Sequence, residues 1–258
     1  MNVKGTNLEL SMCLLDWIDK DKIVWTQLSF NPCAEAIELL KENPDKIYWF
    51  WLSSNPSAVA LLKEHPDKIN WDQLSQNRNA EAIALLKENP DKINWLYLSL
   101  NPNAIQLLKE NPLKINWSQL SENPNAEAIA LLKENTDKIN WTNLSYNPNA
   151  VALLKKRHDK INWKHLSSNP NAEAIALLKE NPDKINWYLL SLNPNAVALL
   201  KENPDKINWT YLSSNPNAEA IALLKENPLK INWTNLSENP SIFTYDYDKM
   251  RENMLLFK

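Results

Sequence analysis

The sequence predicts an all-α fold, a right-handed α-solenoid of ten short helix-pair repeats whose lengths alternate between 24 and 22 residues. Three observations support this prediction. The phrase Lys-Ile-x-Trp-x-x-Leu-Ser-x-Asn recurs ten times, its tryptophans are spaced 24 and 22 residues apart in turn, and stretches rich in Ala, Leu, Lys and Glu separate the copies. Because each unit of such an array contacts only its neighbours, the repeats form one elongated domain.

Residues 1–19 precede the array, and we expect them to form an N-terminal capping helix. Asn7 is a favourable N-cap residue. Apolar residues then follow at helical spacing up to about Asp19, at Leu8, Met12, Leu15 and Ile18. An open solenoid needs such a helix to cover its exposed end.

Residues 20–240 form the repeat array, in which proline and asparagine mark the helix boundaries. Every proline lies five residues before a repeat Trp or seven after it, where it ends one helix and begins the next segment. In eight of the ten copies Asn precedes the Trp as an N-cap. The Asn at the end of the phrase, such as Asn147, is expected to satisfy backbone groups at the turn. We expect each Trp to be largely buried between consecutive units.

The two extra residues of each longer unit lie at the beginning of its second helix. They are the Ala-Glu of Ala-Glu-Ala-Ile-Ala-Leu-Leu, which the shorter units lack. We therefore expect longer helices from Ala34, Ala80, Ala126, Ala172 and Ala218. The alternative architecture is a leucine-rich-repeat-like α/β horseshoe, in which Lys-Ile-Asn-Trp would be a short strand. No alternating Leu-x-Leu strand recurs, which favours the helical prediction.

Residues 241–258 depart from the repeat and are expected to form a divergent C-terminal cap. The repeat Leu-Ser-x-Asn-Pro-Asn-Ala-x-x-Leu-Leu-Lys-Glu-Asn-Pro-Asp-Lys-Ile-Asn-Trp, closed by Ile242-Phe-Thr-Tyr-Asp-Tyr247, resembles tandem-repeat proteins encoded by giant double-stranded DNA viruses. The resemblance covers residues 20–258 and implies no catalytic residues. It also implies a further helical segment after this point, so the cap could be truncated at Lys258.

Composition limits the classes of partner. The net charge of -3 gives no electrostatic reason to expect nucleic acid or an anionic membrane. Two cysteines, Cys13 and Cys33, cannot form a disulfide framework, and the N-terminal residues contain no apolar run that resembles a signal peptide. We therefore expect a protein that is not secreted and that lies in the cytoplasm, the host cytoplasm if the chain is viral, with a monomer as the default state.

Three positions in each Trp helix vary freely, namely one, two and five residues after the Trp. On a helix these positions share a face opposite the fixed Trp, Leu and Ser. We call them the variable face. It contains many large apolar side chains, which are typical anchors for a binding partner. They are Phe30, Phe50, Trp51, Leu96, Tyr97, Leu100, Tyr146, Tyr188, Leu189, Leu192 and Tyr211. The alternative is that the residues at these positions vary without selection, or that their side chains pack against the next helix.

One unit contains the only basic cluster, made of Lys155, Lys156, Arg157, His158, Lys164 and His165. A phosphate or an acidic peptide would suit it, although a drifted loop is the more economical interpretation in an acidic chain. The histidines have no partners at zinc-ligand spacing, and the single glycine, Gly5, excludes a glycine-rich phosphate loop. We expect neither a metal nor a cofactor.

The hypothesis that follows is a non-enzymatic repeat scaffold that binds a partner protein or peptide along the variable face. An enzyme is disfavoured because repetition leaves no unique constellation of titratable groups. A modular single-stranded RNA reader, with one nucleotide per unit, would suit the repetition but requires a basic surface. A structural component of a virion is a further alternative.

Overall fold

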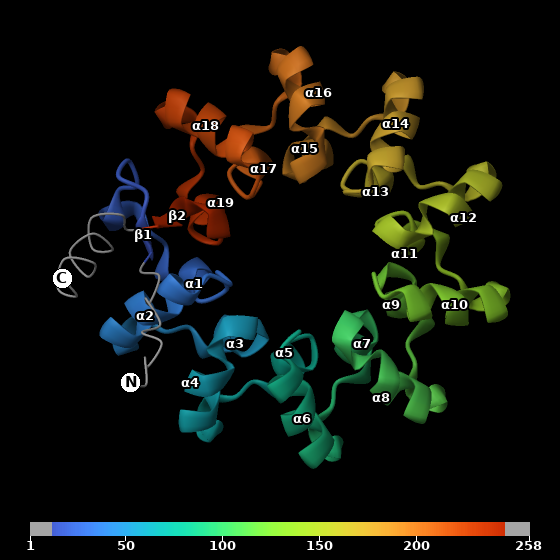
Figure 1. The fold of residues 1–258 in the computed structure, drawn as a ribbon, viewed down its shortest axis with the longest axis horizontal. Helices are drawn as coiled ribbons and strands as arrows, with labels where there is room; N and C mark the ends of the chain where they lie inside the picture. Colours follow the sequence, from blue (N-terminus) through green and yellow to red (C-terminus); the bar gives the residue numbers. More distant parts are fainter. Residues whose placement is uncertain (1–11, 246–258) are drawn as a thin grey trace, which may run out of the picture.

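The repeat array closes into a ring (Figure 1). The computed structural model describes residues 12–245, which contain nineteen α-helices and one two-stranded sheet. The predicted all-α repeat solenoid is thus confirmed. The horseshoe alternative is wrong, because Lys-Ile-Asn-Trp forms the end of a 3₁₀ turn followed by a helix N-cap rather than a strand.

The Trp helices form the inner circle of the ring (Figure 1). Each is four to six residues long and begins at the repeat Trp. Where Asn precedes the Trp, its side-chain oxygen accepts a backbone N–H from the first turn, as Asn70 does from Gln73 at 3.0 Å. These helices are α1 (Trp25–Leu28), α3 (Trp49–Ser54), α5 (Trp71–Ser75), α7 (Trp95–Leu100), α9 (Trp117–Glu122), α11 (Trp141–Leu144), α13 (Trp163–Leu166), α15 (Trp187–Leu192), α17 (Trp209–Leu212) and α19 (Trp233–Ser237).

The second helices form the outer circle, and their lengths alternate as predicted. The longer ones have nine residues: α2 (Ala34–Glu42), α6 (Ala80–Glu88), α10 (Ala126–Glu134), α14 (Ala172–Glu180) and α18 (Ala218–Glu226). The shorter ones have six: α4 (Val59–Glu64), α8 (Ile105–Glu110), α12 (Val151–Lys156) and α16 (Val197–Glu202). A 3₁₀ turn precedes each shorter helix, at Pro56–Ala58, Pro102–Ala104, Pro148–Ala150 and Pro194–Ala196.

The extra Ala-Glu has a structural role at the outer edge. In four longer helices its Glu forms an ion pair with the Lys of the preceding shorter helix. In one of them Lys155 Nζ lies 2.6 Å from Glu173 Oε2. Such exposed pairs contribute little individually to stability. They nevertheless give each longer helix a contact with its neighbour that a shorter helix, which lacks the Ala-Glu, cannot make.

The fixed Leu residues, rather than the Trp residues, fill the centre of each junction between units. The Leu three residues after each Trp, such as Leu120, is fully buried. Each repeat Trp is partly buried and packs against this core, as expected, although none is as fully buried as the Leu. The reason is visible at four junctions, where the Lys of the next unit covers the indole, as Lys138 does 4.4 Å from the centre of a Trp117 ring. A lysine amino group stays solvated while its stem covers the ring.

The fixed Ser and Asn link consecutive units by buried hydrogen bonds. Ser121 Oγ donates to the Trp117 carbonyl at 2.8 Å and accepts the backbone N–H of Asn140 at 3.0 Å. Asn123 Nδ2 donates to two carbonyls of the preceding unit, those of Ser99 at 2.9 Å and Asn101 at 3.1 Å. All ten repeats contain this pair, so the asparagines form a buried ladder that satisfies backbone groups: Asn31, Asn55, Asn77, Asn101, Asn123, Asn147, Asn169, Asn193, Asn215 and Asn239.

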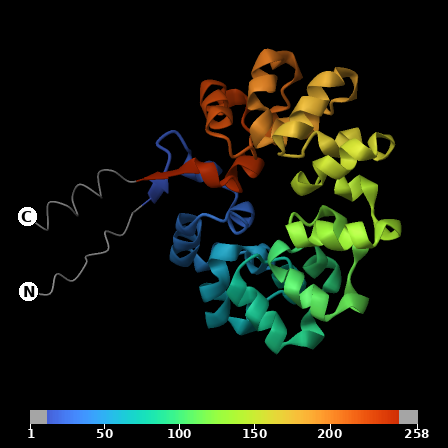
Figure 2. The ribbon, with the colours of Figure 1, turned by 45° about the vertical axis from the view of Figure 1, so that its right-hand side comes forward.

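The last unit makes the same contacts with the first unit as neighbouring units make elsewhere. Val24 donates its N–H to Ser237 Oγ at 2.9 Å, and Asn31 Nδ2 donates to the Ser237 and Asn239 carbonyls at 3.2 and 3.0 Å. The seam also contains an antiparallel pair, β1 (Met12–Leu14) with β2 (Phe243–Tyr245), which projects from the ring in Figure 2. The array is therefore closed, and the expected open solenoid is wrong.

The two predicted caps change accordingly. Residues 12–14 are a strand and residues 16–17 a turn, so the N-terminal capping helix is wrong for the described part of residues 1–19. Its beginning at Asn7 lies outside the described residues. Residues 243–245 pair with β1 instead of covering an open end, and the remainder of the expected C-terminal cap, residues 246–258, also lies outside them.

Candidate functional site

The variable face lies on the inner circle of helices, and its three positions differ in exposure. The side chain one residue after the Trp is exposed in nine of the ten units. Those two and five residues after the Trp are mostly half-buried, because the fifth residue of one unit meets the second residue of the next. Phe30 and Trp51 show this contact, with ring centroids 5.9 Å apart in a T-shaped arrangement. The variable positions of neighbouring units are thus in contact with one another.

The predicted partner-binding residues divide into two groups. The exposed ones are Phe30, Phe50, Leu96, Tyr188 and Tyr211, with Tyr188 the most open at 61%. The half-buried ones are Trp51, Tyr97, Leu100, Tyr146, Leu189 and Leu192. Packing between units covers part of each side chain in this second group, so these six residues are less accessible than the first five.

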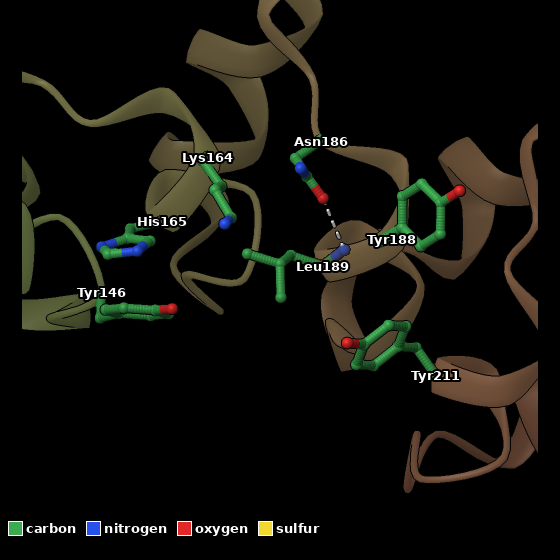
Figure 3. Close-up of a pocket in the computed structure, with 7 residues that line it drawn as sticks. All are labelled: Tyr146, Lys164, His165, Asn186, Tyr188, Leu189 and Tyr211. Atoms are coloured by element: carbon green, nitrogen blue, oxygen red, sulfur yellow. Dashed lines mark hydrogen bonds between the residues drawn. The ribbon is translucent and has the colours of Figure 1, made fainter.

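The turn after α11 and the three Trp helices that follow, α13, α15 and α17, together form a pocket of about 390 Å³ (Figure 3). Its lining residues are Tyr146, Lys164, His165, Asn186, Tyr188, Leu189 and Tyr211. In Figure 3 the Tyr146 and His165 rings lie parallel on one side, and the rings of Tyr188 and Tyr211 lie on the other. The volume falls within the range of pockets that hold small ligands or single peptide side chains.

Two aromatic pairs form the walls of the pocket. Tyr146 stacks on His165 with ring centroids 4.1 Å apart and an interplanar angle of 26°. Tyr188 meets Tyr211 edge to face at 6.4 Å. His165 is oriented by its Nδ1, which lies 3.1 Å from the Thr142 carbonyl. Because a carbonyl only accepts, this nitrogen carries the proton and donates.

The electrostatic surroundings of the pocket are mixed. Glu122, half-buried beside it, has its pKa raised by burial, and a nearby His165 opposes that effect. Burial, together with the Glu122 and Tyr211 charges, raises the pKa of Tyr146 above its ordinary value. Lys164 is exposed, and within residues 12–245 it has neither an ion pair nor a hydrogen bond. The pocket therefore offers one unpaired cation among aromatic walls.

The predicted basic cluster does not stay together. Lys155 pairs with Glu173, and Arg157 pairs with Asp159 while lying over the Trp141 ring. His158 packs edge to face on Trp163, and Lys156 is exposed. Only Lys164 and His165 reach the pocket. The cluster thus contributes two residues to the variable face rather than a separate anion site.

Sequence reasoning missed three residues of the pocket. Lys164 and His165 were assigned to the basic cluster, although they lie one and two residues after Trp163 and so belong to the variable face. That spacing was the signal that could have placed them there. Asn186 was assigned to helix capping, which it performs for Leu189 at 3.0 Å, yet it also lines the pocket.

Other site classes find little support in the part of the chain that the structure describes. No group of three or more His, Cys, Asp or Glu side chains there could hold a metal ion. None of the helices within residues 12–245 has the length and apolarity needed to cross a membrane. Comparison with protein-family models, with curated proteins and with solved structures found no match for this chain.

Proposed function

We propose that this ring is a non-enzymatic scaffold that binds a partner protein or peptide on the variable face. The proposal is based on the different roles of the fixed and the variable positions within each repeat. The fixed Leu is buried in the core, and the fixed Ser and Asn are buried and make hydrogen bonds between units. These side chains are therefore not available to contact a partner. On the Trp helices the variable positions keep accessible surface, and eleven of the thirty are large apolar or aromatic residues.

The charge of the variable face favours a protein partner over nucleic acid. Its thirty positions contain one lysine, Lys164, no arginine, and three carboxylates, at Asp72, Glu122 and Glu238. A single-stranded RNA reader combines stacking aromatics with a basic groove that follows the phosphates. The aromatics are present here but the basic groove is not. Protein interfaces, in contrast, are rich in aromatic anchors and poor in charge at their centres. We propose the cytoplasm as the compartment of this interaction.

The test uses a random peptide display library selected against the full chain, with a variant that removes three exposed anchors. Phe50→Ser, Leu96→Ser and Tyr188→Ser together should weaken binding of the selected peptides at least tenfold, about 1.4 kcal/mol. The melting temperature should change little, because these side chains are exposed. The matched control is Leu113→Ser with Leu229→Ser, which removes two leucines that are 98% and 101% exposed on turns outside the variable face.

Three outcomes would reject the proposal. The library could yield no peptide that binds, the triple variant could bind as well as the wild type, or the control pair could lose as much affinity as the triple variant. Tight retention of a random single-stranded RNA pool at about 150 mM salt would instead favour the RNA reader.

A further inference from the structure

Among the longer units in which Asn precedes the Trp, only the unit of the pocket in Figure 3 lacks a side-chain acceptor one residue after the preceding Trp. In two other longer units the Asn before the Trp donates its Nδ2 to the residue that follows the preceding Trp. Asn94 donates to Asp72 Oδ1 and Asn140 to Ser118 Oγ, both at 2.8 Å. For Asn186 the equivalent residue is Lys164. A lysine has three donors and no acceptor, so it cannot take this bond.

Asn186 therefore retains an unused donor beside an unpaired cation. Its Oδ1 accepts the Leu189 N–H, and its backbone N–H donates to Ser167 Oγ at 2.9 Å. No hydrogen bond from Nδ2 is formed within residues 12–245, and Lys164 likewise has no partner there. Both side chains line the same pocket. An oxyanion can accept from an ammonium and an amide N–H together, and such charge-assisted bonds are the stronger kind.

The size and charge of the pocket select which oxyanion fits. Lys164 is the only lysine or arginine on the variable face, and the half-buried Glu122 is not one of the residues that line the pocket. One cation balances the single charge of a carboxylate, whereas a phosphate or a polyphosphate chain would need more positive charge than the face offers. The Tyr188, Leu189 and Tyr211 side chains supply an apolar wall next to this position (Figure 3).

We propose that this pocket binds an acidic peptide, with one Asp or Glu carboxylate of the peptide received by Lys164 Nζ and Asn186 Nδ2. A neighbouring apolar or aromatic side chain of the peptide packs against Tyr188, Leu189 and Tyr211. This inference rests on the proposed function and deepens it, because it names the chemistry of the partner at one place on the variable face.

The experiment uses two peptide arrays that differ in charge alone. In the first, eight-residue peptides contain one Glu and one Tyr at every relative spacing, and in the second Gln replaces the Glu. The full chain should bind members of the Glu array at least tenfold more tightly than their Gln counterparts. Lys164→Met should abolish this preference, and Asn186→Ala should reduce it. Tyr188→Ser should weaken both arrays, because it removes part of the apolar wall.

Matched variants separate a specific contact from a general effect of charge. Lys156→Met removes the same charge from an exposed lysine of the preceding repeat, outside the variable face, and should keep the preference. Lys164→Glu should reverse it, so that an array with Lys in place of Glu binds best. Melting temperatures check that each variant remains folded, and all these side chains lie on a folded scaffold whose core they do not enter.

The proposal is overturned if wild-type protein binds the Glu and Gln arrays equally or binds neither, or if Lys164→Met retains the preference. It is also overturned if an oligouridylate binds more tightly than any Glu peptide and loses affinity in Lys164→Met. The proposed function fails by a different result, namely selected peptides that do not depend on Phe50 and Leu96. Display peptides that depend on those two residues but show no preference for a carboxylate would reject this inference alone.

Discussion

The nine junctions through which the chain runs and the one seam where it does not are built from the same contacts. At the junction before Trp141, the Ser–N–H hydrogen bond measures 3.0 Å and the Lys138 amino group lies 4.4 Å from the Trp117 ring. At the seam the equivalent distances are 2.9 Å for Ser237 with Val24 and 5.1 Å for Lys22 over Trp233. Chain connectivity is therefore not what sets the geometry of a junction.

The seam differs from the junction before Trp141 because it contains additional contacts. Without a covalent link, closing the ring costs the conformational freedom of both ends. The β1–β2 pair and the bond from the Leu15 N–H to the Ile242 carbonyl at 2.8 Å supply contacts that exist at this junction and not at the one before Trp141. The comparison shows that the same Ser and Asn side-chain contacts occur at all ten junctions, while a short strand pair is added at the seam.

The largest expected effect comes from removing the buried asparagine at each kind of junction. Asn123→Ala and Asn31→Ala each delete two bonds to carbonyls and one accepted N–H, from Asn125 and Cys33 respectively. We expect each to lower the free energy of unfolding by about 2–3 kcal/mol, because the abandoned groups are buried. Urea denaturation measures both.

Comparing Asn31→Ala with Asn123→Ala is informative because Asn31 is buried against a preceding unit only if the ring is closed. In an open array Asn31 would have no unit before it, and its replacement would cost no more than a lost cap, about 1 kcal/mol. A much smaller loss for Asn31→Ala than for Asn123→Ala would therefore contradict the ring.

A smaller effect is expected from the lysines that cover the Trp rings. Lys138→Met and Lys22→Met keep an apolar stem but remove the charge above Trp117 and Trp233. We expect a loss of about 0.5–1 kcal/mol for Lys138→Met. Lys22 is farther from its ring and also pairs with Asp19 at 3.3 Å, so we expect a similar or smaller loss there. A loss at Lys138 with none at all at Lys22 would indicate that the seam is looser than the other junctions. Thermal denaturation at low and high salt measures the difference.

The smallest effect concerns two half-buried carboxylates, Glu122 in an interior unit and Glu238 in the last unit. Burial raises the pKa of both above the ordinary value, while the Ser214 hydroxyl, donating at 3.1 Å, opposes the shift at Glu238. A raised pKa in the folded state means that each carboxyl stabilises the fold when protonated and loses that contribution as the pH rises through the raised pKa.

Replacing either by Gln should therefore raise the melting temperature near pH 7 and have less benefit near pH 4. The effect should be at most about 0.5 kcal/mol, as for other partly exposed substitutions. Melting curves of Glu122→Gln and Glu238→Gln across this pH range test it. Stabilisation that grows toward low pH would contradict the assigned direction, and no effect at Glu238 alone would place that residue in solvent.

The fold could be predicted from the sequence up to the level of one unit. Trp spacing, proline positions and the Asn caps located every inner helix, and the Ala-Glu insertion gave the longer outer helices. Closure could not be predicted, because it depends on a rotation of about 36° per unit that accumulates over ten junctions. A small change in that angle, which no residue pattern reveals, decides between an open superhelix and a ring.

The sequence predicts which positions form the candidate site but not how far each of their side chains is buried. Variation at fixed offsets from the Trp identified the variable face, including Tyr146 and Tyr188. The half-buried state of Trp51 and Tyr97 depends on how close the next unit lies, which is again set by the rotation between units. The pocket is lined by residues of four successive units, and how these units are placed relative to one another is known only from the structure. The sequence alone therefore does not show that Lys164 and Asn186 line the same pocket.

The measurement that tests the ring most directly is a disulfide across the seam. Cys13 in β1 faces Thr244 in β2, and facing residues of an antiparallel pair lie close enough for a disulfide. Cys33 should compete poorly, because burial and its bond to Glu35 raise the pKa of its thiol to about 11. If the ring is closed, mild oxidation of dilute Thr244→Cys protein should form an intrachain disulfide, seen as a faster band on a non-reducing gel, and adding Cys13→Ser should abolish it. Free thiols, or disulfide-linked dimers alone, would contradict closure.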